Sequence, residues 1–138
     1  LDPNLRDRAS YIKENYLPLE EYKCIELVNE NVEIIDGVST INVDGHTFGQ
    51  QLIKINGGDQ DIVFCSDLIP LRSHLQLPWI MGYDLNALKT LEEKKCFLNK
   101  AANNKWWLWF YHDPITVAVK VARGKKYFDV VEEVLRND

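Results

Sequence analysis

Residues 61–67 read DIVFCSD and residues 106–113 read WWLWFYHD. Each segment contains a continuous apolar run, which is typical of a strand that is covered on both faces inside an α/β layer. Between them, apolar residues of segment 86–104 recur at helical spacing, so we expect a helix there. Asn86 or Asp84 can cap this helix, and Lys94 lies in the charged stretch 92–95, which is expected to face solvent. A strand, a helix and a second strand in succession predict a crossover that leaves the two strands parallel. We therefore expect an α/β fold in which these two strands are parallel.

The segments around this unit predict further strands. Two β-branched runs, residues 32–35 and 38–43, flank Asp36-Gly37, a dipeptide that favours a two-residue hairpin. Residues 51–55 and residues 116–122 also have the pattern of strands. Residues 127–135 are compatible with either a last strand or a short helix.

The N-terminal part predicts a different pattern. Apolar residues at helical spacing predict a helix over residues 4–16. Pro18 is expected to end it, because the residue before a proline avoids the α region. Residues 22–28 are then expected to be extended.

Composition excludes several classes of protein. The 138 residues carry 16 Lys and Arg against 21 Asp and Glu, a net charge of −5. The length fits one domain, so we expect residues 1–138 to form a single unit. The acidic balance argues against a nucleic-acid partner, and neither a membrane span nor a signal peptide is recognisable. Three scattered cysteines are expected to be buried or half-buried free thiols of a cytoplasmic protein: Cys24, Cys65 and Cys96.

Three side chains follow predicted strands at the points where those strands end. Asp67 follows the strand at 61–65, His112 follows the aromatic strand, and His46 follows the strand at 38–43. The carboxyl ends of parallel strands share one sheet edge, where α/β folds place their ligands. Imidazole nitrogen and carboxylate oxygen suit zinc. The alternative is that the aspartate caps a turn and that each histidine is a hydrogen-bonded surface group.

Three motifs in this order resemble the metallo-β-lactamase-fold hydrolases. GHTFG at 45–49 resembles their G-H-T-x-G loop, and FCSDL at 64–68 resembles their apolar strand ending in Gly-Asp. YHDP at 111–114 resembles the strand end that carries the last metal-binding histidine. The stretch 67–85, DLIPLRSHLQLPWIMGYDL, is similar to the single-domain branch that includes quorum-quenching lactonase-like proteins. The resemblance implies the C-terminal half of an αββα sandwich, in which a mixed sheet has flanking helices.

The resemblance also implies roles for individual residues. His46 would complete the ligands of a first zinc, Asp67 would bridge two zincs, and His112 would bind the second. His74 matches a position near the site and is a weak candidate for contact with substrate. The complete protein would be a two-zinc hydrolase that opens a lactone, an ester or a similar bond in a small molecule.

The chain departs from the family pattern at three points. The H-x-H-x-D-H motif that begins the family site is absent, Gln50 stands where many relatives have a second histidine, and Ser66 replaces a glycine. The chain also opens at Leu1 without a methionine. We therefore expect a partial domain without the N-terminal half, with no complete catalytic set and little or no activity alone.

A half-sandwich is expected to leave one sheet face without its cover. The side chains of that face are apolar: Ile53, Ile55, Ile62, Phe64, Trp107 and Trp109. A patch of this kind predicts a homodimer or a complex with the missing N-terminal half. A noncatalytic, dimeric remnant or interaction module with the same fold is the alternative function. A binding protein unrelated to this fold is a third reading, in which all three motifs are accidental.

Overall fold

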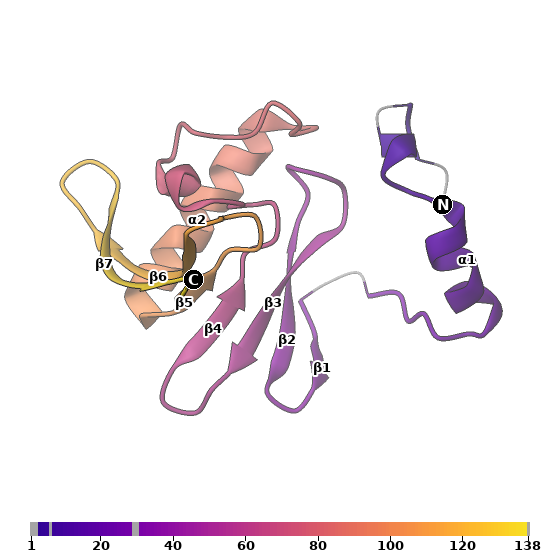
Figure 1. Ribbon diagram of the computed structural model, residues 1–138, viewed down its shortest axis with the longest axis horizontal. Coiled ribbons are helices and arrows are strands. Elements are labelled where there is room, and N and C mark those ends of the chain that lie inside the picture. Colours follow the sequence, from indigo (N-terminus) through magenta and orange to yellow (C-terminus); the bar gives the residue numbers. More distant parts are fainter. Residues whose placement is uncertain (1–2, 6, 29–30, 138) are drawn as a thin grey trace.

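The computed structural model describes residues 3–5, 7–28 and 31–137, so the opening Leu1-Asp2 lies outside the described residues. One mixed sheet forms the body of the molecule, and its strands lie side by side in chain order (Figure 1). The strands are β1 (Glu33–Ile35), β2 (Val38–Val43), β3 (Gln50–Asn56), β4 (Asp61–Phe64), β5 (Trp107–Trp109), β6 (Thr116–Arg123) and β7 (Phe128–Leu135). β4 and β5 are parallel, and the other neighbouring pairs are antiparallel.

The predicted crossover is confirmed. Helix α2 (Ala87–Asn104) connects the parallel strands β4 and β5 and packs against β6 (Figure 1). Asn86 caps it, because its side chain accepts a hydrogen bond from the N–H of Lys89 at 3.1 Å. The helix ends at Lys105, which adopts the left-handed conformation with φ 55° and donates its N–H to the carbonyl of Ala101.

The predicted hairpin is also confirmed. Gly37 sits between β1 and β2 with φ 76°, a conformation that glycine adopts without steric penalty. At the other end of the chain, residues 128–135 form a strand, which decides between the two predicted alternatives. The strand β7 pairs along the length of β6.

The two faces of the sheet differ in their cover. Alternate residues of the central strands pack with Phe97, Leu98 and Ala101 of α2 in the hydrophobic core. These strand residues are fully buried: Leu52, Val63, Leu108 and Val119. Their neighbours point to the other face, where Ile55, Ile62 and Trp109 remain 38–40% exposed. The expectation that both faces are covered is therefore wrong for the described residues, because α2 covers one face alone.

The N-terminal predictions are wrong in part. A short 3₁₀ turn, Asp7–Ala9, precedes helix α1 (Lys13–Glu21), which continues through Pro18. Pro18 lacks the N–H that would bond the carbonyl of Glu14, so it removes one hydrogen bond without ending the helix. The segment 22–28, predicted to be extended, begins with a turn instead, because Tyr22 has φ −80° and ψ 2° and Lys23 has φ 55°. Residues 24–28 belong to no helix or strand, and α1 itself has no buried residue.

The cysteines also differ from the prediction. All three are free, but Cys24 and Cys96 are exposed, and Cys65 alone is buried. Burial raises the pKa of the Cys65 thiol far above its usual range. None of the described helices is both long and apolar enough to cross a membrane.

Candidate metal centre

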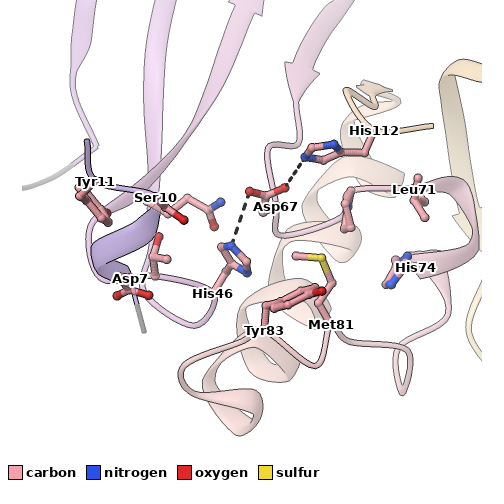
Figure 2. A pocket seen from close by; sticks show the side chains of 13 residues that line it. Asp7, Ser10, Tyr11, His46, Asp67, Leu71, His74, Met81, Tyr83 and His112 are labelled. Carbon is pink, nitrogen blue, oxygen red and sulfur yellow. Dashed lines mark ion pairs between the residues drawn. The ribbon is translucent and has the colours of Figure 1, made fainter. Parts of the chain in front are cut away.

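The structure brings His46, Asp67 and His112 together (Figure 2). Asp67 lies between the two rings, and each of its oxygens faces a different histidine. Its Oδ2 lies 3.5 Å from Nε2 of His46, and its Oδ1 lies 3.0 Å from Nε2 of His112. The convergence predicted from the strand ends is therefore correct, whereas the role of these groups as metal ligands stays a prediction.

The loop that carries His46 is held against the first turns of α2. A Cβ on Gly45 would lie 2.3 Å from the backbone nitrogen of Thr90, so only glycine permits this close approach. The carboxylate of Glu93 accepts the N–H groups of Asp44 and Gly45 at 2.9 and 3.0 Å. The position of His46 thus depends on contacts between the loop and the helix.

Asp84 contacts the other nitrogen of the His46 ring. Its Oδ1 lies 2.9 Å from Nδ1 of His46, and the Asp84 side chain is 1% exposed. Sequence reasoning assigned Asp84 only as an alternative cap of α2, a role that Asn86 fills. The sequence contained one signal for this contact. Two possible capping residues, Asp84 and Asn86, precede α2, and the helix uses only Asn86, so the carboxylate of Asp84 is available for another contact.

Gln50 and Ser66, two residues that depart from the family pattern, contact each other. The Nε2 amide of Gln50 donates to Oγ of Ser66 at 3.0 Å. Ser66 has φ 47°, a left-handed conformation that glycine adopts more readily than serine. The backbone conformation before Asp67 is therefore the one that the family's glycine would favour, and the Gln50 amide contacts the serine that replaces it.

The segment after β5 places His112 in a more open environment. The ring packs edge-on against Tyr111, and the His112 side chain is 51% exposed. The next residue, Asp113, is buried and accepts the N–H groups of Arg72, Ile115 and Thr116. Burial alone would raise the pKa of Asp113, but these backbone hydrogen bonds outweigh it and lower the pKa.

A pocket of about 840 Å³ opens beside the three side chains. Met81 and Tyr83 line one part of it, and residues of the N-terminal segment, including Tyr11, line another (Figure 2). His74 lines the same pocket but lies apart from Asp67 and makes its hydrogen bond with Ser73. Burial and the nearby Lys94 ammonium lower the pKa of His74. Its predicted contact with substrate is untested.

Lys94, like Asp84, is a residue near the site whose role the sequence did not predict. It is fully buried, and its ammonium donates to the backbone carbonyls of His74, Gln76 and Trp79 at 3.0, 2.9 and 2.6 Å. Burial lowers the pKa of Lys94 to about 8. The sequence placed this lysine in the solvated part of α2. In the structure it organises the segment that forms one wall of the pocket.

The donor atoms suit a metal in kind but not in number. Imidazole nitrogens and a carboxylate are ordinary ligands of zinc, and a carboxylate between two imidazoles suits a bridging ligand. Each metal would receive one histidine and one oxygen of Asp67, whereas a catalytic zinc generally has about three protein ligands. Among the described residues, no group of three or more His, Cys, Asp or Glu side chains is arranged to hold a metal ion.

Solved structures resemble the chain closely in fold. The chain superposes on a probable metal-dependent hydrolase from Staphylococcus aureus with a TM-score of 0.84 and 25% identity, over 99% of this chain and 48% of that protein. The chain has half of a metallo-β-lactamase fold. AbOPH, a hydrolase of the beta lactamase superfamily, matches this half-fold with a TM-score of 0.76 and 19% identity, over 99% of this chain and 52% of its own.

A third match leads to the same fold. AidC, a dizinc quorum-quenching lactonase, matches the half-fold with a TM-score of 0.73 and 18% identity, over 95% of this chain and 46% of its own. The sequence matches no protein-family model and no curated protein. The half-fold therefore spans about half the length of the solved proteins that it resembles, which confirms the predicted half-sandwich.

Proposed function

We propose that this chain is the C-terminal part of a zinc-dependent hydrolase that opens a lactone, an ester or a similar bond in a small molecule. The observation that carries the proposal is the position of Asp67, with one oxygen toward His46 and the other toward His112. The hydrolases named above share the fold, which supports a reaction of the same class. The three free cysteines support a reducing, cytoplasmic location.

Each residue of the site has a stated task in this proposal. His46 and His112 would each bind one zinc, and Asp67 would bridge both. Two metals in such a site supply a water of lowered pKa and polarise the carbonyl of the substrate. The protein residues do the rest: Met81, Tyr83 and the other pocket walls bind the organic part of the substrate and exclude water from it.

The missing ligands would come from the other half of the sandwich. The sheet face that α2 does not cover, with Ile55, Ile62 and Trp109, is called the bare face here. It supports this proposal, because it is apolar and includes β4 and β5, the strands that precede Asp67 and His112. We propose that an N-terminal half or a second copy of the chain covers this face. Without an N-terminal half we expect little or no hydrolysis, even from a dimer of the chain, because two protein ligands per metal are too few.

Zinc titration of the purified chain, followed by calorimetry, tests the proposal. We expect zinc to bind, and we expect His46→Ala, Asp67→Ala and His112→Ala each to weaken it by tenfold or more. His74→Ala is the matched control, because it removes a histidine of the same pocket that does not contact Asp67. Zinc binding that Asp67→Ala leaves unchanged would contradict the proposal. Lactone hydrolysis by the isolated chain would contradict the expected need for the other half.

A noncatalytic interaction module is the second candidate. The shortage of ligands among the described residues and the bare apolar face favour it. The same titration separates the two functions. An interaction module would form its complex without zinc, and His112→Ala would not weaken that complex.

A further inference from the structure

Asp84 is less exposed than any of the three candidate ligands. Its side chain is 1% exposed, against 14% for His46, 32% for Asp67 and 51% for His112. A buried carboxylate is expensive unless it is paired. Its Oδ1 contacts His46, and the described residues offer no hydrogen-bond partner to its buried Oδ2. The contact with His46 is therefore the specific interaction that this carboxylate makes.

The distances around the His46 ring indicate where its hydrogen lies. Nδ1 is 2.9 Å from Asp84, which is a hydrogen-bond distance, whereas Nε2 is 3.5 Å from Asp67. An ionised carboxylate can only accept, so the hydrogen of a neutral ring belongs on Nδ1. The lone pair of Nε2 then faces Asp67, where a cation bridged by that carboxylate would lie.

The backbone beside Asp84 holds the same histidine. The N–H of Leu85 donates to the carbonyl of His46 at 3.1 Å, and the N–H of Asn86 donates to the carbonyl of Gly45 at 2.8 Å. Residues 84–86 thus hold both the ring and the backbone of His46. The Lys94 ammonium, fixed on three carbonyls, supplies positive charge close to the Asp84 carboxylate.

The other histidine of the site has no partner of this kind among the described residues. Nε2 of His112 forms an ion-pair contact with Asp67 at 3.0 Å, and among the same residues no hydrogen bond of the His112 ring selects a tautomer. The His46 ring differs, because its hydrogen bond at Nδ1 leaves Nε2 without a hydrogen.

We propose that Asp84 is a positioning residue, which holds His46 as the Nδ1–H tautomer with Nε2 directed toward Asp67 before any ligand binds. The proposal rests on the proposed function for the statement that Nε2 is there to bind a metal. Partners of this kind behind a ligating histidine fix its tautomer and orientation, and their removal typically weakens metal binding by about 10–100-fold.

Nitrogen NMR of the histidine side chains in the metal-free wild-type chain at pH 8 tests the tautomer directly. We expect His46 to carry its hydrogen on Nδ1. A hydrogen on Nε2 of His46, as the other tautomer or as an imidazolium, would overturn the proposal. This measurement needs no variant, so a substitution that fails to fold does not affect it.

Asp84→Asn then tests the consequence. A carboxamide both donates and accepts, so it no longer selects one tautomer, and we expect a mixed His46 signal and zinc affinity lowered by about 10–100-fold. Asp44→Asn is the matched control, because Asp44 lies in the same loop and accepts from Gly49 without contacting the ring. An unchanged His46 signal in folded Asp84→Asn would overturn the proposal.

The two proposals fail in different ways. An Nδ1–H signal in a chain that binds no zinc would refute the proposed hydrolase but keep the tautomer assigned to Asp84. Zinc binding that depends on Asp67, combined with a hydrogen on Nε2 of metal-free His46, would keep the hydrolase and refute the role of Asp84.

Discussion

The two faces of the sheet are made by the same strands, yet α2 covers one face and leaves the apolar side chains of the other partly exposed. Toward α2, Val63 and Leu108 are fully buried. Toward the other face, their chain neighbours Ile62 and Trp109 stay 38% and 40% exposed. Both sets are apolar, so composition does not distinguish the faces. The difference shows that an apolar strand residue becomes core only where a covering element is present.

The largest expected effect concerns what covers the bare face. At micromolar concentration and without an N-terminal half, we expect light scattering to give about twice the 16.1 kDa of one chain. Dimerisation at that concentration corresponds to roughly 8 kcal/mol. We expect Trp109→Glu to return the chain to a monomer, because it places a charge in the middle of the apolar face. A wild-type chain that stays monomeric would show that a second copy does not cover this face.

The next effect compares neighbouring residues of β5. Leu108→Ala removes a fully buried side chain and is expected to lower the free energy of unfolding by about 2–5 kcal/mol. Trp109→Ala is expected to cost less than Leu108→Ala, because its ring remains partly in water. Urea unfolding at a concentration where the chains are monomeric measures both values. Equal losses would mean that the bare face is packed even in the single chain.

Lys94 on the covered side gives the third effect. Lys94→Met leaves the carbonyls of His74, Gln76 and Trp79 without their donor, so we expect a loss of about 1–3 kcal/mol in the free energy of unfolding at pH 7. Urea unfolding measures it. A loss well below this range would indicate that water replaces the ammonium, and that the covered face is less closed than the structure shows.

The pH dependence of unfolding tests the same lysine independently. The pKa of Lys94 is about 8 in the folded protein and 10.5 for an ordinary lysine. Between these values the unfolded chain binds more protons than the folded one, so the contribution of Lys94 to stability rises with pH. We expect the Lys94→Met variant to lack this rise when the two chains are compared from pH 8 to 10. Parallel curves would contradict the lowered pKa.

The smallest effect concerns the end of the covering helix. Lys105 adopts φ 55°, so Lys105→Gly is expected to raise the free energy of unfolding by about 0.5–1 kcal/mol. Lys100→Gly, inside the same helix, is the control and is expected to lower it by roughly 1 kcal/mol. Thermal unfolding followed by circular dichroism distinguishes the signs. A loss of stability in Lys105→Gly would show that its side chain contributes more than its conformation costs.

Local patterns of the sequence determined much of the fold. The Asp36-Gly37 turn and the cap at Asn86 are short-range preferences, and they were read correctly because they depend on neighbours in the chain. The strand ends also predicted that His46, Asp67 and His112 converge. The parallel crossover places Asp67 and His112 at one edge, and β2, which precedes His46, runs in the same direction as β4 because two antiparallel pairings separate them. The prediction for the N-terminal segment was wrong in part, because α1 continues through Pro18 and a turn at Tyr22 and Lys23 follows it.

Only the tertiary structure decided the surroundings of the site. Asp84 and Lys94 looked like a helix cap and a solvated charge, and each is instead buried against a group far from it in the chain: the ring of His46 and the carbonyls of residues 74–79. Sequence periodicity shows which side chains share a face of one element. Whether that face meets water, a helix or a histidine ring depends on packing between distant segments, which no local pattern contains.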